Sequence, residues 1–268
     1  GGDAMPEPRA HALIEWMDKA GVDVCFALRE SMMDVSGYST CMSTNAFMRK
    51  EIEPYPERMY LECMVGPIIR RGVADAIWEL EFLVKERNAK LCKVYAPEDG
   101  PLNDRRLWPF YEKAIELDPD YADPYVGLAD TFGLLPIYNF AEPKEAMPKA
   151  KSYAEEAIKL NPNLASAYTS IAWVQHMYEY DWAGAEANYR KGIQLNPNYA
   201  TGHQWYGILL TQIGRTEESI QKTKKATQLD PTSKIIKFSL SLSCWQAGQV
   251  DLALKTIEEV LTIDPHFP

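Results

Sequence analysis

Histidine is scarce in this chain. Its 268 residues include four, His11, His176, His203 and His266, and no two of them form a His-x-His pair. A hydrolytic zinc or manganese site requires neutral imidazoles and carboxylates that converge and leave one position open for water. The sequence therefore nominates no catalytic residue, no metal ligand and no cofactor.

The chain also lacks a basic excess and a long apolar run. Its net charge is −10, whereas nucleic-acid-binding surfaces are normally basic. It contains no apolar run of membrane-spanning length and no secretory signal. The five cysteines form no Cys-x-x-Cys pair, which favours a reducing compartment over a disulfide framework. These features predict a cytoplasmic protein whose partners are neither nucleic acid nor membrane.

The second half contains a regular series of Asn-Pro and Asp-Pro pairs. Pro162, Pro197, Pro231 and Pro265 stand 35, 34 and 34 residues apart. Proline lacks the N–H that a helix interior needs and disfavours helical geometry at the residue before it. Each pair therefore ends one helix and precedes the next, and this period is typical of stacked helix pairs.

Small and large residues recur at fixed places within the period. With each proline as position 32 of a 34-residue unit, Ala172 and Trp173 take two adjacent signature positions, which Tyr206 and Gly207 take in the next unit. On these residues the second half resembles tetratricopeptide (TPR) repeat proteins. Residues 178–186 and 198–201 are similar to the TPR tails of bacterial winged-helix regulators. The resemblance implies a protein or peptide ligand on the concave surface of a helical solenoid.

A further Asp-Pro pair extends the series upstream. Pro119 lies 43 residues before Pro162, one period plus nine residues. Pro136, Pro143 and Pro148 fall in this interval, and proline does not continue a regular helix. We therefore predict an inserted loop over residues 133–148 and about four repeats in residues 120–268.

The TPR resemblance implies that the first helix of each pair contacts the ligand. Matched by register, this nominates Ser170, Val174, Met177 and Tyr178 in one repeat, Gln204, Ile208, Thr211 and Gln212 in the next, and Phe238, Leu242, Trp245 and Gln246 in the last. The set contains no Lys or Arg that could clamp a terminal carboxylate. A short amphipathic or extended segment, held by apolar anchors and amide hydrogen bonds, fits it better.

The first part of the chain has a different pattern. Short apolar runs at residues 22–28, 60–65 and 91–95 alternate with amphipathic stretches at residues 10–20, 44–53, 73–88 and 104–117. Strands that alternate with helices predict parallel strands joined by helical crossovers. We therefore expect three parallel strands with helices in this part.

Residues 21–24, Asn45 and residues 53–58, 65–67 and 90–95 carry a second resemblance. Together they are similar to the amidohydrolase-related family, whose metal-dependent β/α barrels hydrolyse or decarboxylate small molecules. The resemblance covers about residues 18–114 and supplies three of the eight strands that close a barrel. Without histidine ligands such a segment is not expected to catalyse, and its open sheet edges favour self-association.

The predicted fold class is therefore mixed. Residues 1–106 form an incomplete TIM-barrel-like β/α segment, residues 107–119 a helix that fits both patterns, and residues 120–268 an all-α TPR solenoid. The predicted function is a non-catalytic protein–protein interaction scaffold. Two alternatives stay open: a metal-dependent amidohydrolase-type hydrolase or decarboxylase, truncated here and inactive, and a chimeric reading frame without a function as a unit.

Overall fold

The structure is a computed structural model. It describes residues 105–265 without interruption and, ahead of them, residues 15, 17–19, 25–27, 54, 59–64, 72–87 and 91–93. The helix predicted over residues 44–53 lies outside the described residues, and that over residues 10–20 lies largely outside them. The chain divides into two compact units, Gly1–Pro119 and Asp120–Pro268.

The described part of the first unit combines short strands with two longer helices. Strands β1 (Cys25–Ala27), β2 (Met59–Met64) and β3 (Leu91–Lys93) pair in parallel in the order β1-β2-β3. Helix α4 (Val73–Arg87) packs against α6 (Trp108–Leu117), which follows the 3-10 turn η1 (Arg105–Leu107). Leu107 and Phe110 are buried, so the helix predicted over residues 107–119 contributes its apolar face to this unit.

The predicted mixed fold class is wrong. The described chain is dominated by helices, and its strands are three short segments of 3, 6 and 3 residues, which do not amount to a section of a closed eight-stranded barrel. The apolar runs at residues 22–28, 60–65 and 91–95 do contain β1, β2 and β3, but three short parallel strands do not by themselves identify a barrel. The fold is a helical array of TPR type, and the expectation of self-association through an incomplete barrel sheet loses its basis.

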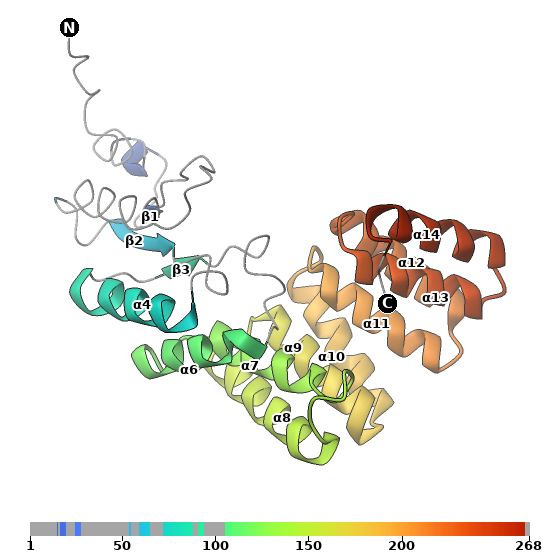
Figure 1. The fold of residues 1–268 in the computed structure, drawn as a ribbon, viewed down its shortest axis with the longest axis horizontal. Coiled ribbons are helices and arrows are strands. Elements are labelled where there is room, and N and C mark those ends of the chain that lie inside the picture. The colour runs from blue at the N-terminus through green and yellow to red at the C-terminus, as the bar shows by residue number, and fades with distance from the viewer. Residues whose placement is uncertain are drawn as a thin grey trace, which may run out of the picture. The chain divides into compact units, whose positions relative to one another are not determined.

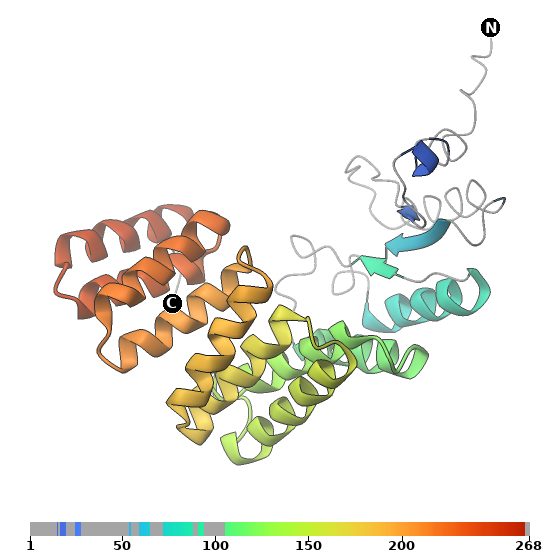
Figure 2. The same cartoon turned by 180° about the vertical axis from the view of Figure 1, so that it is seen from behind.

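The second unit is a stack of helix pairs (Figures 1 and 2). The pairs are α7 (Ala122–Leu134) with α8 (Pro143–Leu160), α9 (Ala165–Val174) and the π-helix η2 (Gln175–Glu179) with α10 (Trp182–Leu195), α11 (Ala200–Gln212) with α12 (Thr216–Leu229), and α13 (Lys234–Gln246) with α14 (Val250–Ile263). None of the described helices is long and apolar enough to cross a membrane.

The first helices of successive pairs touch one another. Contacts of α7 with α9, of α9 with α11 and of α11 with α13 are more extensive than those between successive second helices. The first helices therefore form the tighter row of the stack. We call the surface of this row that carries Asp130, Met177, Ile208 and Leu242 the first-helix face.

The Asn-Pro and Asp-Pro pairs end the second helices as predicted. Helices α8, α10, α12 and α14 each stop at the residue before the Asn or Asp. Asn161 Oδ1 accepts a hydrogen bond from the N–H of Asn163 at 3.0 Å, and the same bond recurs in the next two turns. An Asn or Asp side chain that bonds the backbone two residues on stabilises a turn, and each following first helix begins three residues after the proline.

The connection between α7 and α8 is shorter than the predicted loop over residues 133–148. It comprises residues 135–142, because Pro143 occupies the first position of α8, where its missing N–H has no helical acceptor. Pro148 lies inside α8 and is exposed, so it removes only one backbone bond. Of the nine surplus residues, five lengthen the connection and four lengthen α8, which has 18 residues against 14 in α12.

A buried core joins α9, α10 and α11. Its members are Ala172, Trp173, Ala185, Tyr189, Trp205, Tyr206, Leu209 and Leu210. The rings of Tyr189 and Tyr206 stack with centroids 5.8 Å apart. A Cβ on Gly207 would lie 2.6 Å from Thr223 Cγ2, so glycine is needed there for α11 and α12 to approach this closely.

Candidate functional site

The first helices share one register when they are aligned on the preceding proline. Ala172, Gly207 and Ser241 then stand at the same position, and all three are buried. If each first helix is instead aligned on the proline that follows its pair, which is Pro197 for α9 and Pro231 for α11, Ala172 becomes the equivalent of Tyr206. The structure favours the first alignment, so the predicted signature positions of α9 are one residue out.

The extra residue is absorbed in η2. Pro162 and Pro197 are 35 residues apart, one more than the next two intervals. The N–H groups of Tyr180 and Asp181 both donate to the carbonyl of Gln175 at the end of this π-helical turn. A π-helical turn holds one more residue than an α-helical turn. The register is therefore shifted before η2 and restored after it.

The predicted site residues of α9 and η2 fall on different surfaces. Ser170 and Val174 are 3% and 1% exposed, because the shifted register turns them toward neighbouring helices. Met177 and Tyr178, which lie in η2, are partly exposed. Of these four, only the two in η2 contribute accessible surface to the first-helix face.

The predicted site residues of α11 divide in the same way. Gln204 and Thr211 are buried. The Gln204 amide donates to Ser239 Oγ at 3.0 Å, and Thr211 Oγ1 lies 3.3 Å from another serine hydroxyl of α13. Ile208 is partly exposed and Gln212 is exposed. Two of the four thus join α11 to α13, and the other two reach the surface.

All four predicted site residues of α13 are exposed. Phe238, Leu242 and Trp245 are 37%, 41% and 59% exposed, and Gln246 is exposed as well. Their spacing of four and three residues places the apolar side chains along one side of the helix. Among the described residues, no further helix covers α13 as α13 covers α11.

Asp130 on α7 is a candidate that the sequence pattern did not nominate. It stands eleven residues after Pro119, as Ile208 and Leu242 stand eleven residues after their own prolines. It is partly exposed. The distance from Pro119 could have identified Asp130 from the sequence. It was not used, because the nine surplus residues between Pro119 and Pro162 left the register of this repeat undefined.

The carboxyl group of Asp130 has little to stabilise a negative charge. Ser170 Oγ lies 2.5 Å from Asp130 Oδ1 and 3.0 Å from the carbonyl oxygen of Ser166. A hydroxyl has one proton, so it donates to one of these acceptors at a time. Burial raises the pKa of Asp130 to about 7, and the hydrogen bond from Ser170 opposes this shift only in part.

His176 and His203 stand on successive first helices but have separate partners. His176 Nε2 lies 2.8 Å from Gln212 Oε1, and His203 Nε2 lies 3.0 Å from the carbonyl oxygen of Pro197. Burial lowers the pKa of both imidazoles. Within the described part of the chain, no group of three or more His, Cys, Asp or Glu side chains is placed to hold a metal ion.

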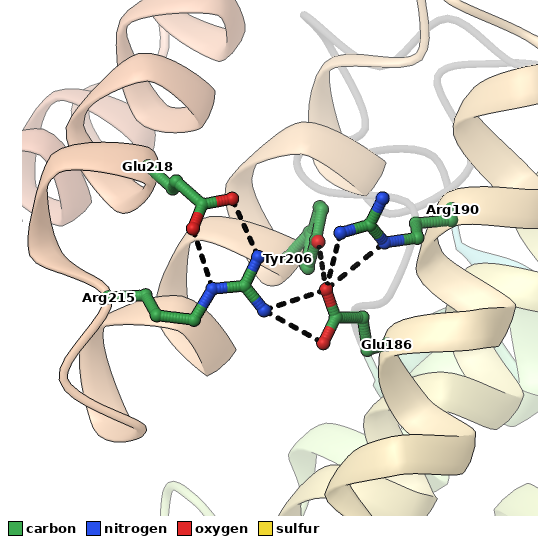
Figure 3. Close-up of polar contacts among 5 residues, drawn as sticks. All are labelled: Glu186, Arg190, Tyr206, Arg215 and Glu218. Atoms are coloured by element: carbon green, nitrogen blue, oxygen red, sulfur yellow. Dashed lines mark hydrogen bonds and ion pairs between the residues drawn. The ribbon is translucent and has the colours of Figure 1, made fainter.

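A cluster of charged side chains links consecutive repeats (Figure 3). Glu186 on α10 accepts hydrogen bonds from the Tyr206 hydroxyl at 2.6 Å, from Arg190 Nη2 at 2.7 Å and from Arg215 Nη1 at 2.8 Å. Arg215 Nη2 also donates to Glu218 at 2.6 Å. The hydrogen bond from Tyr206, followed by those from the two arginines, lowers the pKa of Glu186 to about 2. Both carboxylates are paired within the protein, so the cluster joins helices and is not a candidate ligand site.

Comparison with known proteins gives distant relatives. No family model matches the chain. The transcriptional regulator HilA of Salmonella typhimurium is 21% identical over 189 residues, which cover 68% of this chain and 34% of HilA. The human protein O-mannosyl-transferase TMTC3 is 22% identical over 202 residues, or 70% of this chain and 22% of that protein. The chain therefore spans about a third or less of these relatives.

A solved structure shares the fold. TTC0263, a thermophilic TPR protein of Thermus thermophilus, matches with a TM-score of 0.50 at 17% identity, over 60% of this chain and 83% of that one. At this identity the likeness concerns the fold alone, and the fold is that of a TPR-type helical array. The amidohydrolase resemblance of the first part finds no support in these comparisons.

Proposed function

We propose that this protein is a scaffold that binds a peptide, or a segment of a partner protein, on the first-helix face. One observation carries the proposal: η2, α11 and α13, which all belong to the row of first helices of a TPR-type array, keep apolar and amide side chains accessible. They are Met177, Tyr178, Ile208, Gln212, Phe238, Leu242, Trp245 and Gln246. Stacked helix pairs use extended surfaces of this kind to bind other chains.

The ligand that fits this surface is a short amphipathic or extended segment. Leu242 and Trp245 offer apolar anchor points, and the amides of Gln212 and Gln246 both donate and accept hydrogen bonds. Ser170, Val174, Gln204 and Thr211 are buried and would support the surface without touching the ligand. Helices α7, α9 and α11 contain no Lys or Arg, so recognition of a terminal carboxylate is not part of the proposal.

We place the binding function in residues 120–268, the residues of the second compact unit. A cytoplasmic location belongs to the same proposal, because the cysteine pattern favours a reducing compartment. Fractionation of cells that express the chain with an epitope tag tests the location separately from binding. Recovery of the tagged chain outside the cytoplasmic fraction would contradict it.

The proposal is tested by selecting peptides from a displayed random 12-residue library on the full chain and measuring their affinity by fluorescence anisotropy. Trp245→Ala is expected to weaken binding by about fivefold or more, roughly 1 kcal/mol, because exposed tryptophans on binding surfaces are frequent hot spots. Trp182→Ala is the matched control. Trp182 is 48% exposed against 59% for Trp245, and it begins a second helix.

The control variant should bind within about twofold of the wild-type chain, a difference below roughly 0.4 kcal/mol. Equal losses in the two variants would place the ligand elsewhere and contradict the proposal. Failure to select any peptide that binds the chain would contradict it as well.

A further inference from the structure

An ionisable acid stands on the first-helix face, and neither its own helix nor the next two first helices carry a Lys or Arg. Asp130 is partly exposed on α7, and the sequences of α7, α9 and α11 contain no Lys or Arg. The hydroxyl of Ser170 is its hydrogen-bond donor, and this donor is shared with the Ser166 carbonyl. A carboxylate in such a place is poorly compensated within the protein.

In the next repeat, tryptophans occupy the two positions equivalent to those of Asp130 and Ser170. Asp130 and Trp173 both stand eleven residues after a proline, and Ser170 and Trp205 both stand eight residues after one. The rings of Trp173 and Trp205 pack with centroids 4.6 Å apart, and Trp173 is 5% exposed. Asp130 and Ser170 thus replace an apolar contact by a polar one, at a place where Asp130 as a residue stays partly exposed.

Four lysines on α8 and α13 have partners of their own. On α13, Lys234 binds Asp264 at 2.6 Å and Lys237 lies 3.8 Å from Glu259. On α8, Lys151 binds Glu179 at 2.6 Å, and Lys149 lies over the ring of Phe132. A cation for Asp130 would therefore have to come from a bound molecule.

We propose that Asp130 receives a cationic side chain, lysine or arginine, of the segment that binds the first-helix face. This inference rests on the proposed function and adds the chemistry of one ligand position to it. An ionised carboxylate forms short, charge-assisted hydrogen bonds with ammonium and guanidinium groups. The remaining surface, with Ile208, Leu242 and Trp245 on the same row of helices, would hold the apolar part of the segment.

The inference predicts a pH dependence. With a pKa of about 7, Asp130 is about one-tenth ionised at pH 6 and nine-tenths ionised at pH 8. Because the cation binds the ionised form, affinity should rise about tenfold over this range. Other titratable groups on the surrounding elements are Asp123 on α7, Lys149 and Lys151 on α8, His176 on η2, Tyr189 on α10 and Tyr199 before α11.

Asp130→Asn separates the contribution of Asp130 from that of these groups. The probes are fluorescein-labelled 12-residue peptides selected on the full chain, each paired with a version in which norleucine replaces one lysine or arginine. The wild-type chain should bind the cationic version at least fivefold more tightly at pH 8, and about tenfold more tightly at pH 8 than at pH 6. Asp130→Asn should lose both differences.

Asp123→Asn removes an exposed carboxylate from the same helix and should keep both differences. If peptides bind the first-helix face but wild type and Asp130→Asn respond alike to norleucine and to pH, the inference is overturned and the proposed function stands. If no selected peptide is sensitive to Trp245→Ala, the proposed function fails, and the inference fails with it.

Discussion

Asp130 is held in a place that favours its neutral form. Its pKa lies at about 7 in the folded chain, against 3.8 for an unperturbed aspartate, and burial is the cause. A raised carboxyl pKa means that the folded state binds the proton more tightly than the unfolded state does. The stability associated with this proton is fully present below pH 4 and is lost as the pH rises through 7.

Asp130→Asn should therefore raise the free energy of unfolding at pH 9 and change it little at pH 4. A pKa difference of one corresponds to about 1.4 kcal/mol, and water that reaches the carboxyl group reduces the effect, so we expect a gain of about 1–3 kcal/mol. Urea unfolding at the two pH values measures it. Glu155→Gln, at an exposed carboxylate of α8, is the control and should give the same small difference at both. A gain for Asp130→Asn that does not depend on pH would contradict this account.

The turn between the two helices of a pair contains a residue with a positive φ angle, and in one repeat this residue is a tyrosine. Tyr180 has φ 58° at the end of η2, while Gly214 and Gly248 have φ 80° and 75° at the corresponding places ahead of α12 and α14. A side chain with a Cβ is strained in this left-handed region and glycine is not. The connection before α10 thus keeps a local strain that the next two repeats avoid.

Tyr180→Gly should stabilise the chain by about 1 kcal/mol, the lower end of the strain that a non-glycine residue carries in the left-handed region. Tyr180→Ala is the matched comparison, because alanine removes the phenol ring but keeps the Cβ. Thermal unfolding of the three chains measures the effect. If alanine stabilises as much as glycine, the gain comes from removing a ring that is 71% exposed, and the backbone explanation is wrong.

At the scale of elements, the proline period predicted where the helices end but not all that lies between them. The ends of α8, α10, α12 and α14 follow from the Asn-Pro and Asp-Pro pairs. The start of α8 did not follow, because Pro143 and Pro148 were interpreted as helix breakers, although proline is favourable at a first helical position. The shift in α9 was also missed, because residues 175–179 contain no Gly or Pro to mark an insertion.

The nominated site residues are all accessible on one helix and partly buried on the others. On α13 all four nominated residues are accessible. On α9 the one-residue shift nominated Ser170 and Val174, which are buried. The polar partners of Gln204 on α13 could not be predicted from spacing, because they depend on how closely two first helices approach.

At the scale of the whole molecule, the charge cluster around Glu186 couples one repeat to the next. Its members come from α10, α11 and the start of α12, so the contact crosses a boundary between repeats. In a stack of repeats, stability depends on such interfaces between neighbours as well as on each repeat itself. Loss of the cluster should therefore reduce the cooperativity of unfolding as well as its free energy.

Glu186→Gln tests this coupling. The pKa of Glu186 is lowered from 4.5 to about 2, so its contribution is present above pH 4.5 and is lost as the pH falls toward 2. We expect the variant to lose about 2 kcal/mol at pH 7 and progressively less below pH 4.5, because solvent screening reduces the full electrostatic effect of the lowered pKa. Urea unfolding across this range measures it.

Glu218→Gln is the control for this prediction, because the side chain of Glu218 is 48% exposed and its ion pair among the described residues is with Arg215. Exposed pairs contribute little, so its loss should be clearly smaller than that of Glu186→Gln. Equal losses in the two variants would show that Glu186 does not hold the repeats together beyond an ordinary surface ion pair.

The π-helical turn η2 also bears on how a repeat array can change in length. One added residue in an α-helix rotates everything beyond it by about 100° around the helix axis, which would face the following side chains toward the wrong neighbours. Here the turn over Gln175–Glu179 takes up the added residue, and α10 still ends at its Asn-Pro pair. The one extra residue of this repeat is thereby confined to one turn, and the helices on both sides keep their packing partners.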